Sequence, residues 1–500
     1  MEYQSTRDAN VRAASMETIL RGIAPDGGLF VPCGLPALGE KDFSALGGMD
    51  YEGRAAYILK LFLTDFTEQS LQDCVRRAYG GGRFETVHPA PLRRLDDVTY
   101  MLELWHGPTC AFKDMALQIL PHLLCEAKNR LSSGAGQEPY TTVILVATSG
   151  DTGKAALEGF RDVPGTRVIV FYPEDGVSAM QKAQMVTQEG GNVHVCAIRG
   201  NFDDAQQSVK SVFTDDQMGQ ALERARMNFS SANSINWGRL VPQIVYYVSA
   251  YVDLLQSRAL RPGDTFNVAV PTGNFGNILA AYYAKSMGVP IHKLICASNQ
   301  NNVLTDFIRT GVYDRTRAFY TTLSPSMDIL ISSNLERLLY ALSGSAQTVS
   351  GWMGELRETG RYEVDAATKA ALGTLFYGGF CDDTDTLATM GAIFRERRYL
   401  CDTHTAVAAR VYQQYKQESG DGRVTVIVST ASPFKFPRAA LQALGDTSDI
   451  DDFAALGRLS AITGIHVPGP LASLEQKPVR FTETCTGETM SDYILRALEI

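Results

Sequence analysis

Lys113 is the residue that offers the clearest chemistry in this sequence. It ends the segment His106-Gly-Pro-Thr-Cys-Ala-Phe-Lys113, which follows a predicted strand at 99–105 and precedes a predicted helix. A lysine amine bonds to an aldehyde as a Schiff base only when it is deprotonated, and apolar neighbours such as Ala111 and Phe112 favour the neutral amine. Spacing alone would favour the alternative, a solvated lysine at a helix start.

The turn Pro-Thr-Gly-Asn-Phe-Gly-Asn at 271–277 could hold a phosphate. It follows a predicted buried strand and opens a predicted helix. Glycines let the backbone approach a phosphate closely, and a helix N-terminus supplies free N–H groups and partial positive charge. An ordinary strand-to-helix turn is the alternative, which a lone Gly-x-x-Gly pattern would favour.

A second turn, Ala-Thr-Ser-Gly-Asp-Thr-Gly-Lys-Ala at 147–155, invites comparison with the nucleotide-binding P-loop. That pattern requires glycine at position 148 and serine or threonine at position 155. This sequence has Thr148 and Ala155 instead. The nucleotide interpretation therefore fails at two positions.

A phosphate-bearing substrate would need local cations, because the formal net charge of the chain is -9. Arg239 is a candidate, since a guanidinium can form a bidentate pair with a phosphate. It ends the segment Ser-Ala-Asn-Ser-Ile-Asn-Trp-Gly-Arg at 231–239, whose Asn and Ser side chains could fix its orientation. Without further information a solvent-exposed arginine would be the preferred interpretation.

Two other reactive side chains lie close to Lys113 in the sequence. Cys110 would need a base to act as a nucleophile, and His106 is only its neighbour along the chain, so we interpret Cys110 as a small packing residue. His106 could be a base or a phosphate donor, but a loop histidine is more often a packing or hydrogen-bonding residue.

Alternating strand and helix patterns predict an α/β protein with two αβα lobes, mostly parallel sheets and an N-terminal, mainly helical domain. The apolar runs lie at 141–148, 167–172, 193–198, 266–270, 294–298 and 424–429. The expected domains are 1–100 for the N-terminal domain, 136–235 for the small αβα domain, and 101–135 with 236–500 for the large one. Lys113 would then lie between the lobes, where ligand clefts commonly form. Pro121 should kink the helix after Lys113 or end its first portion.

Composition excludes several classes of protein. A net charge of -9 argues against nucleic acid or an anionic membrane as a partner. No apolar run approaches the roughly 20 residues that span a bilayer, and the N-terminal residues lack signal-peptide features, so we expect a cytoplasmic protein. The 9 cysteines are scattered without a Cys-x-x-Cys pair, so we expect neither a disulfide framework nor a metal site.

The segment 106–114 closely resembles the cofactor-lysine motif of threonine synthases, which are pyridoxal-phosphate enzymes of the tryptophan-synthase-β-like fold, fold type II. The resemblance extends over nearly the whole chain, including 3–7 and 24–32 near the N-terminus. The segments 322–329 and 332–334 also match, and we assign them a structural role.

The resemblance implies a set of site residues around pyridoxal 5′-phosphate bound to Lys113. Asp151 is expected near the cofactor 3-hydroxyl, and Thr430 is expected to face the pyridine nitrogen. The further cofactor contacts that it implies are Phe112, Gly273, Asn274, Phe275, Gly276 and Asn277. The substrate contacts that it implies are Ser149, Thr152, Lys154, Asn233, Ser234 and Arg239.

The activity implied by the resemblance is the conversion of O-phospho-L-homoserine and water to L-threonine and phosphate. Lys113 would serve as the general base at Cα and move protons to and from Cβ and Cγ. Arg239 and Lys154 would stabilise the leaving phosphate. We expect a monomer or homodimer with this small-molecule substrate.

Two other functions remain open at this point. A related phospho-lyase would release a 2-oxo acid, ammonia and phosphate, and the sequence does not separate it from a threonine synthase. A nucleotide-binding regulatory protein built on the same αβα units would bind no chromophore.

Overall fold

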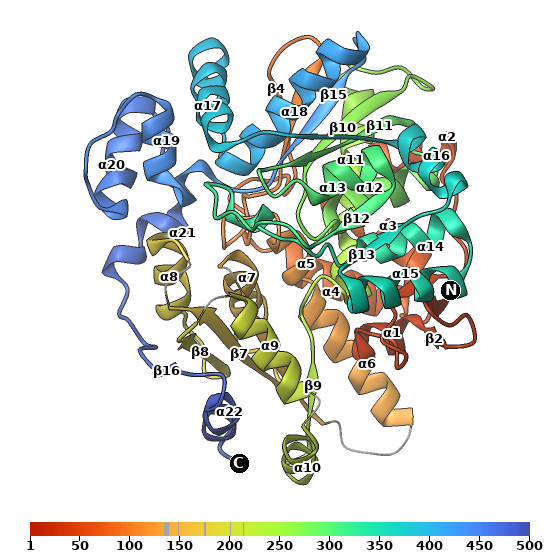
Figure 1. The fold of residues 1–500 in the computed structure, drawn as a ribbon, viewed down its shortest axis with the longest axis vertical. Helices are drawn as coiled ribbons and strands as arrows, with labels where there is room; N and C mark the ends of the chain where they lie inside the picture. The colour runs from red at the N-terminus through yellow and green to blue at the C-terminus, as the bar shows by residue number, and fades with distance from the viewer. Residues whose placement is uncertain (135–139, 149, 175–176, 201, 214) are drawn as a thin grey trace.

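The computed structural model describes the chain except residues 135–139, 149, 175–176, 201 and 214. Figure 1 shows two lobes, with the larger one in the upper right and the smaller one in the lower left. The larger lobe is built on a six-stranded sheet and the smaller one on a five-stranded sheet. The two predicted lobes are thus confirmed.

The six-stranded sheet has the order β14-β11-β10-β15-β5-β4. Its strands are β4 (Leu92–Arg94), β5 (Thr99–Glu103), β10 (Phe266–Pro271), β11 (Ile291–Ser298), β14 (Phe376–Phe380) and β15 (Thr425–Ser429). Neighbouring strands pair in parallel, whereas β4 pairs with β5 antiparallel. Strands β10 and β15 are buried along their whole length, which explains why they read as continuous apolar runs.

Helices cover both faces of this sheet. Because side chains alternate along a strand, Val268 and Val270 belong to one core and Ala269 to another. The first core contains α11 (Trp237–Gln256) and α12 (Gly276–Ser286). The second contains α17 (Asp383–Arg397), α18 (Thr403–Ser419) and α19 (Pro437–Ala443).

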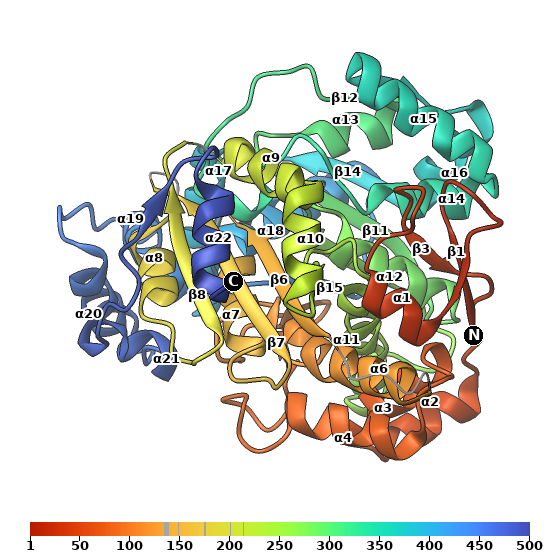
Figure 2. The same ribbon diagram turned by 90° about the horizontal axis from the view of Figure 1, so that it is seen from below.

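The five-stranded sheet has the order β16-β8-β7-β6-β9 and is parallel throughout. Its strands are β6 (Thr141–Ala147), β7 (Thr166–Pro173), β8 (Val193–Ile198), β9 (Met227–Ser230) and β16 (Thr484–Cys485). Helices α7 (Asp151–Gly159) and α8 (Ala179–Val186) pack on one face. Helices α9 (Phe202–Phe213), α10 (Asp216–Arg224) and α22 (Met490–Leu498) pack on the other, as Figure 2 shows.

The end of the chain corrects the expected domain division. Strand β16 pairs with β8, and α22 packs on the small sheet, so residues 484–498 belong to the small lobe and not to the large domain of 236–500. A strand of two residues has no measurable periodicity, and its partner lies far away in the sequence. The sequence therefore carried no signal for this return.

The N-terminal region combines four helices with a small antiparallel sheet of order β2-β1-β3. Its elements are β1 (Glu2–Ser5), β2 (Arg12–Ala14), α1 (Ser15–Arg21), β3 (Phe30–Pro32), α2 (Glu40–Gly47), α3 (Tyr51–Phe62) and α4 (Glu68–Tyr79). Tyr3, Phe62 and Trp237 form an aromatic cluster that joins this region to α11 of the large lobe.

The remaining elements connect and surround the two lobes. They are α5 (Asp114–Leu117), α6 (Leu120–Gly134), α13 (Val303–Thr310), β12 (Val312–Asp314), η1 (Pro325–Met327), α14 (Leu335–Ser343), α15 (Ala346–Thr359), β13 (Arg361–Glu363), α16 (Ala366–Leu375), η2 (Pro433–Lys435), α20 (Asp452–Thr463), α21 (Gly469–Ala472) and η3 (Leu474–Gln476). The helix after Lys113 is interrupted between α5 and α6, as Pro121 predicts. Among the residues that the structure describes, none of the helices combines the length and the hydropathy of a membrane-spanning segment.

Candidate active site

The loop that carries Lys113 is held by the strand end at 429–432. The amide of Phe112 donates a hydrogen bond to the Thr430 carbonyl at 2.8 Å, and the Ser432 amide donates to the Cys110 carbonyl at 3.0 Å. Cys110 has a positive φ of 57°, which turns the chain sharply before Lys113. The carboxyl ends of β5 and β15 are neighbours in the sheet, so these contacts follow from their pairing. The amine therefore projects from a firmly tied loop.

The Lys113 amine lies in a buried polar cluster. Its Nζ is 3.6 Å from Oδ2 of Asp151 and 3.4 Å from Oγ of Ser326, and it lies 4.9 Å from the centre of the Phe112 ring. Burial lowers the pKa of Lys113, and the nearby cations Lys435 and Arg239 lower it further, whereas Asp151 acts in the opposite direction. The net effect favours the neutral amine that carbonyl chemistry requires.

Asp151 opens α7 and reaches across from the small lobe to the large one. Its Oδ1 accepts from Lys435 Nζ at 2.6 Å and from Gln181 Nε2 at 2.9 Å. Burial acts to raise the pKa of Asp151, but Lys435, Lys113 and the Gln181 hydrogen bond outweigh it and hold the pKa far below its ordinary value. Asp151 is thus a permanent carboxylate that links the two lobes.

The turn at 273–277 is shaped for a close approach of backbone to ligand. Phe275 adopts a left-handed conformation with φ 64° and precedes the N-terminus of α12. A Cβ on Gly273 would lie 2.6 Å from the Ser326 carbonyl oxygen, so glycine is required there. The Asn274 carbonyl accepts two hydrogen bonds from Asn334, which fix the turn.

Asn277, in the first turn of α12, has a buried donor that no described residue satisfies. Its Oδ1 accepts hydrogen bonds from Tyr246 and Tyr247, whereas its Nδ2 has no partner in the described part of the chain. A buried amide without a partner costs about 1–3 kcal/mol. This donor and the helix N-terminus together are suited to an anion.

Arg239 is a second buried cation near Lys113. It is 3% exposed, its Nη1 donates to the Ala232 carbonyl, and its Nε has no partner among the described residues. Burial lowers the pKa of Arg239 to about 10. Asn233 and Ser234 lie just before α11 and are half-buried, with Ser234 Oγ 3.4 Å from Ser333 Oγ. The exposed-surface alternative for Arg239 is therefore excluded.

The three predicted substrate residues of the turn at 147–155 differ in their surroundings. Thr152 follows Asp151 in the first turn of α7 and is half-buried. Lys154 is buried in an ion pair with Glu158 at 3.0 Å and a contact with Gln188, and it does not join the cluster at Lys113. Ser149 lies outside the described residues.

His106 and Cys110 take packing positions. His106 stacks on Trp105 and its Nε2 is 2.9 Å from a Glu103 oxygen. Burial raises the pKa of Cys110 above its ordinary value, which makes that thiol a poor nucleophile.

The structure adds three groups that the sequence interpretation missed. Lys435 has 0% exposure and bonds to Asp151. Ser326, within the segment that was assigned a structural role, faces both Lys113 and Asp151. His404 accepts at Nε2 from the Ser326 amide at 3.2 Å, and its Nδ1 is 2.7 Å from Asp402. The position of Lys435, shortly after the carboxyl end of the buried strand β15, was a usable signal in the sequence. The sequence around Ser326 and His404 carried no comparable signal.

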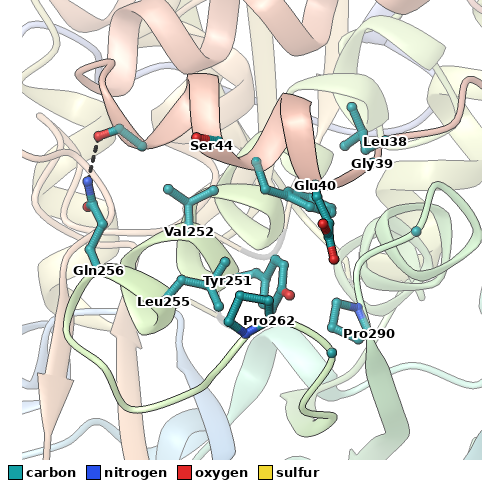
Figure 3. Close-up of a pocket in the computed structure, with 14 residues that line it drawn as sticks. Leu38, Gly39, Glu40, Ser44, Tyr251, Val252, Leu255, Gln256, Pro262 and Pro290 are labelled. Atoms are coloured by element: carbon teal, nitrogen blue, oxygen red, sulfur yellow. Dashed lines mark hydrogen bonds between the residues drawn. The ribbon is translucent and has the colours of Figure 1, made fainter.

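A cavity of about 540 Å³ lies elsewhere, between α2 and the C-terminal end of α11 (Figure 3). Its lining is chiefly apolar and includes Leu38, Phe43, Tyr251, Leu255 and Pro262. None of the described residues that were predicted for the site lines it. The buried titratable groups at Lys113 therefore mark the candidate active site better than cavity volume does.

Models of known protein families match most of this chain. Residues 84–430, which contain Lys113 and the turn at 273–277, match the family described as pyridoxal-phosphate dependent enzyme. Residues 2–79 match the threonine synthase N terminus, and residues 405–494 match the threonine synthase C-terminal family. The chain belongs to the threonine synthase family of pyridoxal-phosphate-dependent enzymes.

Individual proteins agree with this assignment. The chain is 39% identical to threonine synthase-like 1 of Homo sapiens over 466 residues, which cover 90% of this chain and 61% of that protein. It therefore spans about 61% of the length of that relative. It is 36% identical to threonine synthase of Pseudomonas aeruginosa over 445 residues, which cover 89% of this chain and 90% of that protein.

Solved structures give the same result for the fold. Threonine synthase from yeast superposes with a TM-score of 0.89 at 30% identity, covering 100% of this chain and 99% of that one. The pyridoxal-phosphate-bound threonine synthase from Brucella melitensis gives 0.86 at 34% identity and covers 99% of both chains. The expected family, fold type and cofactor are thus confirmed.

The residues present fit pyridoxal phosphate. Asn277 Nδ2 and the N-terminus of α12 offer donors for its phosphate. The glycine at 273 leaves room that a Cβ would fill, and Lys113 supplies a buried amine for its aldehyde.

Proposed function

We propose that the protein converts O-phospho-L-homoserine and water to L-threonine and phosphate. The observation that carries the proposal is the buried Arg239, whose Nε has no partner among the described residues and whose charge lowers the pKa of Lys113. A second buried cation beside the cofactor lysine is what a substrate with its own phosphate requires. Membership of the threonine synthase family supports the same substrate.

The cofactor would be held by Lys113 and by the turn at 273–277, with Asp151 near its 3-hydroxyl and Thr430 near its pyridine nitrogen. When bound, it supplies an electron sink for the negative charge that develops on the substrate carbons. Thr430 is a neutral hydroxyl, which would not hold the pyridine nitrogen protonated. Phe112 packs beside the Lys113 amine and keeps water from it.

Lys113 would serve as the base for the proton transfers. Burial lowers the pKa of Lys113, which favours the neutral amine that a base requires. The amine takes protons from Cα and Cβ, and phosphate leaves from Cγ. The amine then delivers one proton to Cγ, water adds at Cβ, and the amine returns the other proton to Cα. One flexible side chain can reach all three carbons.

Arg239 would stabilise the departing phosphate through fixed charge. Asn233 and Ser234 precede it at the start of α11, and Thr152 lies beside Asp151, so these three remain proposed substrate contacts. Ser149 stays a proposed contact from the sequence. Lys154 is the weakest of the predicted set, because Glu158 and Gln188 already engage its amine.

The proposal is tested by incubating the protein, loaded with pyridoxal phosphate, with O-phosphohomoserine. Threonine, 2-oxobutyrate and phosphate are measured in the same reaction. Equal amounts of threonine and phosphate are expected. Release of phosphate without threonine would overturn the proposal.

A phospho-lyase is the second candidate. Identity to threonine synthase-like 1 of Homo sapiens is 39%, compared with 36% to threonine synthase of Pseudomonas aeruginosa, and the first name does not state the reaction. The same residues would bind the same phosphate ester, and the outcome would depend on when water arrives. Equal amounts of 2-oxobutyrate, ammonia and phosphate would identify this activity.

We include in the proposal a cytoplasmic location and a monomer or homodimer.

A further inference from the structure

Lys435 is a lysine without solvent exposure that lies at the meeting point of three segments. It ends η2, just after β15, and its Nζ donates to the Thr109 carbonyl at 3.1 Å. The same Nζ lies 2.6 Å from Oδ1 of Asp151, which belongs to the small lobe. A buried charge is tolerated only when it is paired and hydrogen-bonded, and Lys435 meets both conditions.

The two oxygens of Asp151 are used unequally. Oδ1 forms the short contact with Lys435 and accepts from Gln181 at 2.9 Å. Oδ2 is 3.6 Å from the Lys113 Nζ and 3.4 Å from the Ser326 hydroxyl. The carboxylate is therefore committed to Lys435, and its contact with Lys113 is long for an ion pair.

We propose that Lys435 is a positioning residue for the chemistry at Lys113. Its ammonium neutralises Asp151 and draws the carboxylate away, so that Asp151 cannot hold the Lys113 amine as a tight ammonium salt. The Asp151–Lys435 pair then presents a group with no net charge to the cofactor, as a neutral amide would. This inference deepens the function proposed above and rests on it for the role of Lys113.

The charges that face Lys113 come from three elements. Asp151 on α7 favours the charged amine, whereas Lys435 on η2 and Arg239 on α11 oppose it. From the fourth side η1 presents the neutral Ser326 hydroxyl, whose backbone is held by His404 together with Asp402. The neighbouring Asp114 directs its carboxylate to Thr109.

Opposite effects follow for the two members of the pair. Without Lys435, an uncompensated carboxylate would stabilise the Lys113 ammonium, and more alkaline conditions would be needed to free the amine. Without Asp151, the cations Lys435 and Arg239 would destabilise that ammonium, and the amine would be free at lower pH. If Lys435 were merely a structural link to Thr109, the two substitutions would not move the amine in opposite directions.

The test measures how fast the full chain, freed of cofactor, attaches pyridoxal phosphate at a series of pH values, followed by visible absorbance. Lys435→Met should raise the midpoint of this pH profile by at least about one unit, which slows attachment about tenfold below the wild-type midpoint. Asp151→Asn should lower the midpoint. The double variant Asp151→Asn, Lys435→Met should return close to wild type.

Two controls separate charge from structure. Lys435→Arg keeps the charge and should stay within about half a unit of the wild-type midpoint. Lys128→Met removes another buried lysine that donates to a backbone carbonyl, that of Gly165, and should leave the midpoint unchanged. Circular dichroism and the thermal midpoint report whether each variant is folded.

Midpoints of the two single variants that move in the same direction, or not at all, would overturn the inference. If Lys435→Met does not fold, Asp151→Asn and the double variant must still differ, with the higher midpoint in the double variant. Midpoints that move as expected in a protein that makes no threonine would leave this inference standing and remove the proposed function alone.

Discussion

Asp114 accepts hydrogen bonds from both the backbone amide and the hydroxyl of Thr109, at 2.9 and 2.8 Å. The contact closes the loop that carries Lys113 onto the start of α5. A Cβ on Gly107 would lie 2.5 Å from the same carboxylate, so the loop packs directly against it. Burial raises the pKa of Asp114 to about 6, although the Thr109 hydrogen bonds act to lower it. The loop is therefore fastened by a carboxylate whose charge is costly at neutral pH.

Asp114→Asn should stabilise the protein at neutral pH. Because the folded-state pKa is raised, the contribution of the aspartic acid is fully present below about pH 4 and is lost as the pH rises through about 6. The asparagine variant should gain up to about 3 kcal/mol at pH 7 and little at pH 4. Urea unfolding at several pH values measures the difference. An equal change at both pH values would contradict the assignment to charge.

Lys113→Ala should abolish covalent attachment of pyridoxal phosphate while the fold is retained. The lysine is the buried amine that faces the turn at 273–277 through Ser326. Wild-type protein reduced with borohydride should carry the cofactor on Lys113, as mass spectrometry of the digested chain can show. Labelling of a different lysine in the wild-type protein would contradict both the proposed mechanism and the candidate active site at Lys113.

Arg239→Met should lower kcat/KM for O-phosphohomoserine by about 100-fold, because two charged hydrogen bonds to the substrate phosphate are lost. Arg239→Lys should recover part of this loss, since it restores the charge but not the planar fork. Inorganic phosphate should raise the thermal midpoint of wild type, because the buried Arg239 lacks an anionic partner among the described residues. An equal rise of the thermal midpoint in Arg239→Met would show that inorganic phosphate binds at a site other than Arg239.

Asn277→Asp should weaken the binding of pyridoxal phosphate by about 10- to 100-fold. The new carboxylate can still accept from Tyr246 and Tyr247, but it replaces a free donor with a negative charge beside the cofactor phosphate. Absorbance titration with the cofactor measures the affinity. Asn274→Asp is the matched control, because that side chain is exposed in the same turn and should have a smaller effect.

Ile494→Ala should destabilise the small lobe by about 2–5 kcal/mol. Ile494 has 0% exposure and packs from α22 onto the small sheet. Hydrogen exchange should increase in β7 and β8 more than in β10 and β15. A uniform increase over both sheets would show that the chain end does not act on the small lobe separately.

The candidate residues for chemistry were predicted from local patterns in the sequence. Lys113, Asp151, Arg239 and the turn at 273–277 each stand where a strand or loop gives way to a helix, and such junctions have clear sequence signals. Lys154 shows the limit of this reasoning. It follows the same pattern, yet its amine pairs with Glu158 one helical turn away and contacts Gln188, which lies 34 positions away in the sequence.

By itself, the sequence determined the family, the two αβα lobes and the cofactor, and it named Lys113 as the candidate lysine, because periodicity and motifs are written in short stretches of chain. Only the tertiary structure decided that Lys435 pairs with Asp151, that Ser326 faces Lys113, and that residues 484–498 return to the small sheet. These contacts join residues that lie more than 200 positions apart in the sequence. Burial and charge at such meeting points set the protonation of Lys113, and no local pattern encodes them.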